Sequence, residues 1–202
     1  MDMQAPPLSR QAQKSQRTRE KLIESTISLI RRGGLSAASA KRIAQGAGMT
    51  WGAAQHHFGS KEQILEAIVA RSHDNFVTRF AEMDASQPFP ERVGTFVDWM
   101  WDHYRSEVYL ATIEIIMAER DPDQVDLPLT PFEWPNPDHV AMMTRIFGDQ
   151  NVPAEDMLEA LIFLHCLLTG LAIQSVLEGD TGRLEPHLQR CRRILAGMLS
   201  AG

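Results

Sequence analysis

Cysteine is almost absent from this sequence of 202 residues. Its two thiols, Cys166 and Cys191, are too few for a disulfide framework. A chain of this length buries roughly 70% of the surface that its unfolded form would expose, which is enough for an unaided hydrophobic core. The sequence therefore excludes the class of small proteins that depend on disulfide bonds for their stability.

Long apolar runs are also scarce. The N-terminal segment has no apolar stretch of the kind that a secretory signal carries. The most apolar run covers residues 160–173. Runs of about 10–14 residues are more often buried core helices than membrane spans. We therefore expect a soluble, cytoplasmic protein that does not enter a membrane.

Strand signals and common catalytic motifs are missing as well. Apolar residues recur at helical spacing along nearly the whole chain, with no alternating stretch that indicates a strand. No G-x-G-x-x-G, P-loop or G-x-S-x-G sequence is present. These absences predict an all-α fold and give no indication of a catalytic residue or of a cofactor.

Positive charge is concentrated near the N-terminus. Residues 1–61 contain ten Lys or Arg and three acidic residues, which gives this segment a net charge of +7. Because the whole chain has a formal charge of −6, the remaining residues carry −13. Such asymmetry indicates a polyanionic partner for the basic segment, although a basic patch can also serve solubility alone.

Helix start and stop signals divide the chain into about nine helices. Gly33 and Gly34 end the first helix, Ser39 and Thr50 can cap the next two, and Ser60 with Gln63 forms a capping box. The proline-rich segment 121–137 is expected to be a loop. The predicted helices cover residues 17–32, a short segment after Ser39, 51–58, 60–84, 90–105, 107–119, 137–147, 153–177 and 186–199.

Two adjacent histidines, His56 and His57, end the short segment TWGAAQHHF. Neighbouring residues on a helix point about 100° apart, whereas paired helical metal ligands need a spacing of three or four. Positions four residues before His56 and three after His57 hold Gly52 and Ser60, which offer no such partner. We therefore predict no metal site. A helical enzyme or metal protein that uses His56, His57 or His165 with remote groups stays an alternative.

The segment IAQGAGMTWGAAQHHF describes two short helices joined by a glycine-containing turn, which is the pattern of a helix-turn-helix. A second helix from Trp51 to His57 would turn Ala54 and Phe58 inward. Gln55 would face outward, where a glutamine can bond an adenine edge with about 1–3 kcal/mol of discrimination. The other predicted base-facing residues are Trp51, Gly52, Ala53 and His56, and those within reach of phosphates are His57, Thr50, Lys41 and Lys61.

The same segment resembles the DNA-binding domain of TetR-type (tetracycline-repressor-like) transcriptional regulators. The resemblance rests on a set of features in the first third of the chain: Gly34 after the first helix, Ile43-Ala44, Ala47-Gly48, His57-Phe58, Ser60-Lys61-Glu62 and Leu65. The remaining two thirds match only in the number and length of the helices. Two positions depart from the family pattern, because Gln55 stands where a tyrosine is usual and Ala54 replaces a larger core residue.

The resemblance implies a homodimeric regulator, most often a repressor, that binds a palindromic operator and is released by a small molecule. The implied domains are a flexible basic arm over 1–16, a three-helix helix-turn-helix domain over 17–62, and a helical effector-binding and dimerisation domain over 63–202. The dimer interface would use the last two long helices, about 154–178 and 186–199. The implied DNA contacts are Ser39, Lys41, Thr50, Trp51, Gly52, Ala53, Gln55, His56, His57 and Lys61.

An apolar cavity with few polar groups would suit a hydrophobic or aromatic effector. Aromatic, methionine and isolated polar residues on the central helices are the candidates, although each of them can also be plain core. The candidate effector-binding residues are Trp101, Tyr104, Met117, Trp134, Met143 and His165. A helical interaction adaptor that binds no DNA is the second alternative.

Overall fold

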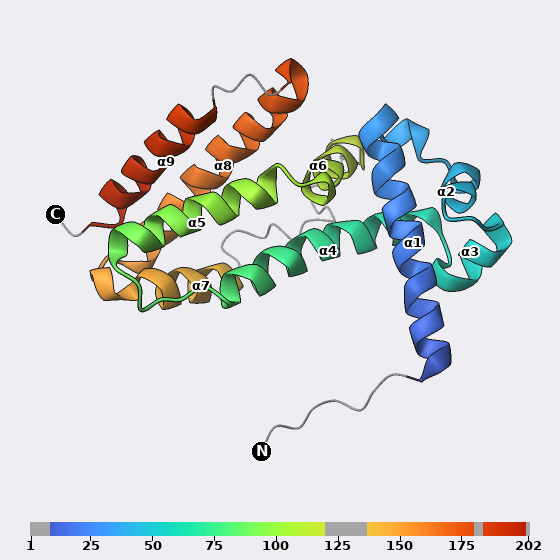
Figure 1. The fold of residues 1–202 in the computed structure, drawn as a ribbon, viewed down its shortest axis with the longest axis horizontal. Coiled ribbons are helices and arrows are strands. Elements are labelled where there is room, and N and C mark those ends of the chain that lie inside the picture. The colour runs from blue at the N-terminus through green and yellow to red at the C-terminus, as the bar shows by residue number, and fades with distance from the viewer. Residues whose placement is uncertain (1–8, 120–136, 180–183, 201–202) are drawn as a thin grey trace. The chain divides into compact units, whose positions relative to one another are not determined.

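The computed structural model describes residues 9–119, 137–179 and 184–200. Within these ranges the chain forms nine α-helices and two short 3-10 helices and has no strand, which confirms the predicted all-α fold (Figure 1). The helices are α1 (Arg10–Gly33), η1 (Leu35–Ala37), α2 (Ala40–Gly46), α3 (Trp51–Phe58), α4 (Lys61–Ala81), α5 (Phe89–Tyr104), α6 (Glu107–Glu119), α7 (Pro137–Phe147), η2 (Gly148–Gln150), α8 (Ala154–Glu178) and α9 (Leu184–Met198).

Helix α1 begins at Arg10, earlier than the predicted start at Arg17. The hydroxyl of Ser9 accepts a hydrogen bond from the amide of Ala12 at 3.2 Å, which caps this earlier start. Arg, Gln, Lys and Ala dominate the added turns, and they are good helix formers even though no apolar stripe marks the segment. The flexible arm expected over residues 1–16 is therefore helical from Arg10 onward.

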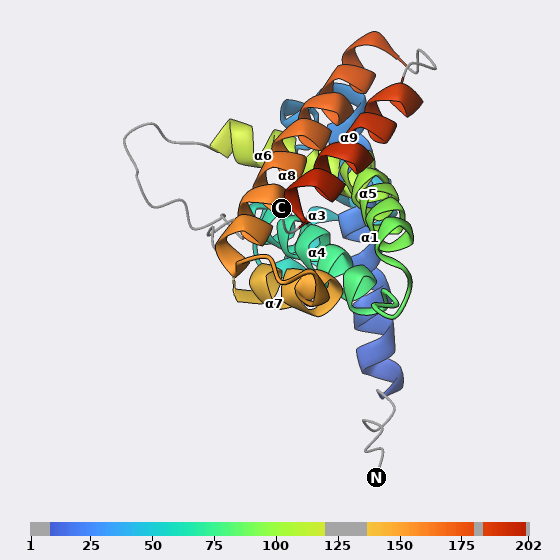
Figure 2. The ribbon, with the colours of Figure 1, turned by 90° about the vertical axis from the view of Figure 1, so that its left-hand side faces the viewer.

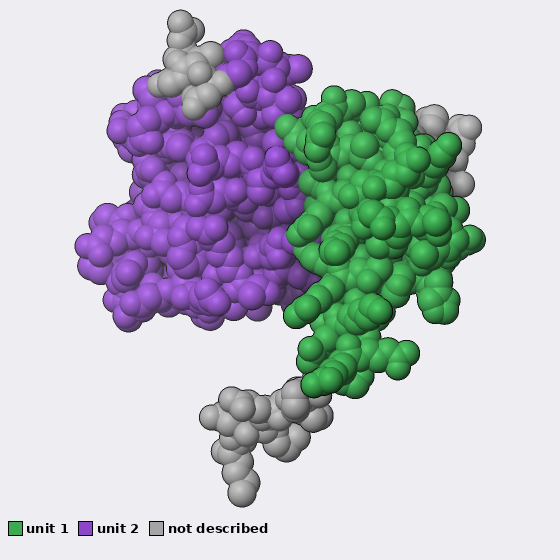
Figure 3. Space-filling view, turned by 45° about the vertical axis from the view of Figure 1, so that its right-hand side comes forward, with its two compact units in different colours: residues 1–70, 111–129 green, residues 71–110, 130–202 purple. Residues whose placement is uncertain are grey.

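The described residues fall into two compact units, coloured green and purple in Figure 3. Unit 1 contains residues 9–70 together with 111–119, and unit 2 contains 71–110 and the described residues from 137 onward. The division falls within α4 and within α6, whereas the sequence predicted an arm over 1–16 and domains over 17–62 and 63–202. Part of α6 belongs to unit 1, where Glu114 on α6 bonds Arg31 on α1, at 3.3 Å between Arg31 Nη1 and Glu114 Oε1.

Unit 1 is built around the apolar face of α1, which packs against α2 and α3 (Figure 1). The buried residues of α1 recur at helical spacing, so the helix has one face inside and one in solvent. The approach of α1 to α2 is close: a Cβ at Gly46 would meet the Ser25 hydroxyl at 2.2 Å. That hydroxyl donates to the carbonyl of Ile43 at 2.9 Å and so ties the two helices together.

Unit 2 is a bundle in which α5 and α7 pack against α8, and α9 packs against both α5 and α8. Figures 1 and 2 both show α8 and α9 side by side. The end of α7 is fixed by Arg92 on α5, whose buried guanidinium donates to the carbonyl of Ile146 and to the carboxylate of Asp149 at 2.8 Å. Such a charge-assisted pair satisfies an arginine that would otherwise be costly to bury.

Helix α8 has an unusual distribution of apolar residues. It is 25 residues long with a mean hydropathy of 2.0, and among the described ranges it is the one helix long and apolar enough to cross a membrane. Its inner face, including Leu164 and Leu168, is buried in unit 2, yet only 28% of the apolar window is buried. The exposed large apolar residues of this helix are Ile162, Phe163, Ile173, Val176 and Leu177.

Candidate nucleic-acid interface

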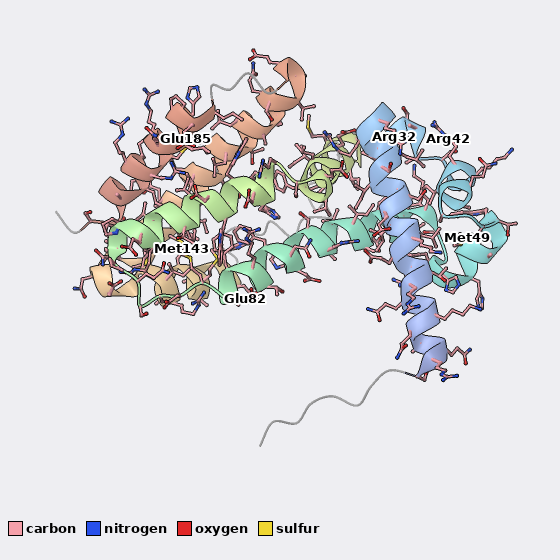
Figure 4. The ribbon with its side chains drawn as sticks, in the orientation of Figure 1. Arg32, Arg42, Met49, Glu82, Met143 and Glu185 are labelled. Carbon is pink, nitrogen blue, oxygen red and sulfur yellow. The ribbon has the colours of Figure 1, made fainter. Side chains whose placement is uncertain are left out.

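Helix α2 and the turn after it have well-formed ends. The Ser39 hydroxyl accepts from the amide of Arg42 at 3.4 Å and caps α2, and Lys41 is exposed on its first turn. The amide of Met49 donates to the carbonyl of Ala44 at 2.9 Å, which closes the turn that leads to α3. Figure 4 labels Arg42 on α2 and Met49 in this turn. The two short helices are therefore joined tightly, as the sequence predicted.

Helix α3 covers Trp51–Phe58, the range that the sequence predicted. The Thr50 hydroxyl accepts from the amide of Ala53 at 3.3 Å and caps the helix. Ala54 is fully buried and Phe58 nearly so, so these residues hold the helix on unit 1. The exposed positions between them are Gly52, Ala53, Gln55 and His56, with Trp51 half-buried at the start. The face predicted to meet base edges thus points to solvent.

Gly52 lies on this exposed face. Among the described residues, a Cβ at this position would meet no atom within 4 Å, apart from its own chain neighbours and helix backbone. A glycine in a helix costs roughly 1 kcal/mol relative to alanine. Because no internal contact requires its small size, Gly52 leaves room for close approach from outside.

The C-terminal end of α3 is held by α1. His57 is half-buried, and its Nδ1 lies 3.3 Å from the hydroxyl of Ser15. Arg19 donates from Nη1 to the carbonyl of His57 at 2.5 Å, and its guanidinium carbon lies 3.8 Å from the centre of the Phe58 ring. Gly59 then ends the helix with φ of +81°, a conformation that residues with side chains rarely adopt. Ser15 lies in the segment expected to be a flexible arm and Arg19 in the expected first helix, and neither was predicted to contact α3.

The start of α4 completes the set of predicted contact residues. The Ser60 hydroxyl accepts from the amide of Gln63 at 3.3 Å, as the capping box predicted. Lys61 is the first helical residue and is half-buried. Glu62 follows, and hydrogen bonds from its own backbone amide and from Ser60 lower its pKa, so this helix start also carries a negative charge. A phosphate at this helix end would be bound by Lys61 rather than by the helix end alone.

The paired histidines do not form a metal site within the described residues. The ring centres of His56 and His57 lie 5.8 Å apart in an edge-on arrangement. Across the described ranges, no group of three or more His, Cys, Asp or Glu residues is placed to hold a metal ion. His57 instead bonds Ser15, and His56 is exposed on the outer face of α3.

Two of the candidate effector-binding residues meet in unit 2. The hydroxyl of Tyr104 on α5 lies 2.7 Å from Nδ1 of His165 on α8. Beside them, the hydroxyl of Tyr109 lies 2.7 Å from that of Thr169, one turn further along α8. The ring of His103 packs against both tyrosines, at 5.3 Å from Tyr104 and 5.0 Å from Tyr109 between ring centres. These five residues form a polar cluster inside an apolar bundle, which we call the Tyr-His cluster.

Burial sets the protonation of the Tyr-His cluster. Burial lowers the pKa of His103 to about 4, with neighbouring positive groups such as His165 adding to the shift. Burial also lowers the pKa of His165 to about 4 and raises the pKa of Tyr109 to about 12. The pKa of Tyr104 is raised as well, chiefly by burial. At neutral pH the cluster is therefore uncharged and offers only neutral hydrogen-bonding groups.

The other candidate effector residues do not join this cluster. Trp101 lines a groove of about 480 Å³ between α5 and α9, together with charged residues such as Asp98 and Arg192. Met117 is 71% exposed and belongs to unit 1, contrary to the expectation that it lines an internal cavity. Met143 is fully buried on α7 (Figure 4). Trp134 lies outside the described residues.

Sequence reasoning overlooked His103, Tyr109 and Thr169 in this cluster. Thr169 lies four residues after His165 and so shares a helix face with a residue already singled out, whereas His103, directly before Tyr104, has no such spacing. That spacing was an available signal. The pairing of α5 with α8 was not, because it joins segments that lie far apart in the sequence.

Comparison with known proteins agrees with this geometry. The family model of bacterial regulatory proteins, tetR family, matches residues 22–68. No curated protein matches the chain. Among solved structures, one described as the molecular basis for control of antibiotic production by bacterial hormones is 22% identical, with a TM-score of 0.70 and coverage of 92% of this chain and 98% of the other.

Two further solved structures have the same fold. Salmonella enterica GusR is 23% identical, with a TM-score of 0.65 and coverage of 91% of this chain and 95% of its own. A transcriptional regulator from Rhodococcus sp. Rha1 is 16% identical, with a TM-score of 0.63 and coverage of 90% and 95%. At these identities the likeness is one of fold, and it extends over both units of the chain.

Proposed function

We propose that this chain is a regulator of the tetR family and that it represses transcription by binding a palindromic operator as a homodimer. The match of residues 22–68 to the tetR family model and the similar fold of solved structures support this proposal. The observation that carries the proposal is the capped, exposed helix α3, held on unit 1 by Ala54 and Phe58. A helix in this position of a helix-turn-helix enters the major groove and meets base edges with its first residues.

The outer face of α3 supplies the base contacts in this proposal. Gln55 bonds an adenine edge through its amide group, and Trp51 and Ala53 pack on thymine methyl groups. His56 lies on the same exposed face, and Gly52 allows the close approach of the helix to the groove. In this proposal, Gln55 contacts a base at the position where the resembling family usually has a tyrosine.

Residues around α3 bind the phosphates and fix the position of the helix in the groove. Lys41 and Lys61 contribute charge on either side of α3, and Ser39, Thr50 and His57 contribute neutral hydrogen bonds. Phosphate contacts give affinity without sequence preference, whereas base contacts give specificity. The positive charge of residues 1–61 supports this division.

The homodimer forms through the exposed apolar face of α8, with α9 beside it. Exposed apolar patches of this kind mark interaction sites, and a second copy would cover the same residues by two-fold symmetry. Charged residues Glu155, Asp156 and Glu159 on the first turns of α8 are exposed next to the apolar face, and they favour a protein partner over lipid. Such a dimer presents two α3 helices to half-sites about 34–36 Å apart or somewhat more, and acts in the cytoplasm.

A small neutral molecule with an aromatic or hydrophobic body acts as the effector and binds unit 2 near the Tyr-His cluster. Tyr104, His165 and Tyr109 offer neutral hydrogen-bonding groups within an apolar bundle, which is the usual make-up of a small-molecule site. A solved structure of similar fold is described in terms of control by bacterial hormones, which is in keeping with control by a signal. An effector that binds two dimer conformations with a difference of about 1–3 kcal/mol would change operator affinity by roughly 5- to 150-fold.

Selection of binding sites from random duplex DNA tests the proposal. A palindromic consensus is expected, with affinity that falls steeply as salt rises because phosphate contacts release counterions. Protein that selects no duplex at low salt would contradict DNA regulation and favour the interaction adaptor. Hydrolytic or metal-dependent activity lost on His56→Ala, His57→Ala or His165→Ala would favour the enzyme alternative.

Two variants separate the proposed roles. Lys61→Ala is expected to weaken binding to all sequences and to reduce the slope of log K against log salt by about 0.9 for each phosphate that is no longer bound. Gln55→Ala is expected to relax the preference at one base pair in each half-site at a cost of about 1–3 kcal/mol. An unchanged consensus with Gln55→Ala would show that another face of α3 reads the bases.

A further inference from the structure

The first turns of α1 contact the end of helix α3 that carries His57. Ser15 lies 3.3 Å from Nδ1 of the His57 ring, and Arg19 bonds the backbone carbonyl of the same residue at 2.5 Å. The guanidinium of Arg19 also lies over Phe58, the core residue that follows. Three contacts from one helix therefore converge on two adjacent residues at the end of the proposed recognition helix.

A neutral imidazole carries one proton, so one ring nitrogen donates a hydrogen bond and the other accepts. When the Ser15 hydroxyl donates to Nδ1, the proton must lie on Nε2, and Nε2–H is then a donor. When Nδ1 carries the proton instead, Nε2 is an acceptor and repels the lone pairs of a phosphate oxygen. Only the first arrangement allows a neutral His57 to bind a phosphate.

We propose that Ser15 and Arg19 are positioning residues that hold His57 with Nδ1 as acceptor and Nε2–H as donor toward a DNA phosphate. The inference rests on the proposed function, which places His57 among the phosphate contacts. Neither positioning residue needs to touch DNA itself: Ser15 orients the ring and selects its tautomer, and Arg19 fixes the backbone from which the ring projects.

Arg19 acts on the helix end by a general mechanism. The last carbonyl groups of a helix lack partners within the helix and carry partial negative charge, so a nearby arginine stabilises that end. Stacking over Phe58 adds a cation–π contact that fixes the guanidinium in place. The result is an α3 whose last turn cannot fray while its outer face meets the groove.

Operator affinity of Ser15→Ala, measured at pH 8 with the DNA selected by the unmodified chain, tests the proposal. Ordering a free side chain on binding costs about two- to tenfold in affinity, so a dimer is expected to lose between about fourfold and 100-fold. Because neutral His57 releases no counterion, the salt slope should stay unchanged, unlike that of Lys61→Ala. Alanine is a good helix former, so α1 is expected to stay intact.

The tautomer itself is observable in the ring nitrogen resonances of His57. The unmodified protein is expected to carry the proton on Nε2, and Ser15→Ala is expected to give a mixture of both tautomers. Gln16→Ala is the matched control, because Gln16 is exposed and directly follows Ser15 on the same helix. A proton on Nδ1 in the unmodified protein, or equal effects of the two substitutions, would overturn the proposal.

Arg19→Met tests the backbone contact, with Arg17→Met as the matched control at an exposed position of α1. Arg19→Met is expected to weaken operator binding several-fold without a change in salt slope, and Arg19→Lys to recover most of the loss. A reduced salt slope would show instead that Arg19 binds a phosphate directly, which contradicts the positioning role. If the unmodified chain selects no operator, the proposed function itself is contradicted. That result is distinct from the outcomes of the Ser15 and Arg19 variants, which test only the positioning role.

Discussion

Acidification is expected to destabilise unit 2 because two buried histidines must gain a proton. His103 and His165 have pKa values lowered to about 4, chiefly by burial. Histidine in an unfolded chain has a pKa near 6.5, so the unfolded state binds protons first as the pH falls. The stability contributed by the neutral rings is complete above pH 6.5 and is lost progressively between pH 6.5 and pH 4.

The size of the effect follows from the two pKa values. At pH 5, a histidine with a pKa of 4 in the folded state and 6.5 in the unfolded state reduces the free energy of unfolding by about 2 kcal/mol. Both rings lie in one cluster and keep some contact with solvent, so the pair is expected to contribute roughly 2–4 kcal/mol. Burial lowers the pKa of His139 too, which acts in the same direction. A loss of this size is a large part of the 5–15 kcal/mol that is usual for a domain.

Urea unfolding followed by circular dichroism at pH 7.5 and pH 5.0, at fixed protein concentration, measures this difference. His103→Phe keeps an aromatic ring beside Phe76 and Tyr109 but removes the titrating group. The difference in the free energy of unfolding between pH 7.5 and pH 5.0 should therefore fall by about half, even if the variant is more or less stable than the unmodified protein at pH 7.5. The control is His56→Gln, which changes an exposed histidine in unit 1. If His103→Phe keeps the full pH dependence, the assignment to the buried cluster is refuted.

Four further substitutions have expected outcomes. Phe163→Glu on the exposed face of α8 should shift the protein from dimer to monomer in sedimentation, whereas Met117→Glu, which replaces a more exposed apolar residue on α6, should not. Gly59→Ala should lower the free energy of unfolding by about 1–2 kcal/mol because φ is +81°, which thermal melting detects as a lower Tm. Gly52→Ala should raise stability by roughly 1 kcal/mol yet weaken operator binding, and equal operator affinity would contradict the close approach at that position.

Local signals in the sequence were sufficient to locate the two short helices of the helix-turn-helix, α2 and α3. Thr50 and Ser60 are capping residues and Gly59 is a stop signal, so the limits of α3 follow from neighbouring residues alone. The start of α1 was missed for the opposite reason. Its first turns carry no apolar stripe, and polar composition alone predicts a flexible segment, whereas Ser9 and a run of good helix formers make it helical.

The interior of unit 2 was less predictable. Tyr104 and His165 were singled out as rare polar groups in apolar helices, and the fold brings them together. Which other residues join them depends on how α5 and α8 are rotated against each other, and sequence spacing within one helix does not contain that information. The exposure of Met117 has the same origin, because composition alone does not tell which face of α6 is covered.

The exposed outer side of α8 has a consequence for how a regulator of the proposed kind would behave at low copy number. If Phe163 and Leu177 are buried only in a dimer, the stability of the protomer depends on its concentration. While monomers outnumber dimers, the dimer concentration, and with it the operator occupancy, rises with the square of the protomer concentration in the cell. A modest fall in expression would then release the target gene much more sharply than a regulator that binds DNA as a single chain.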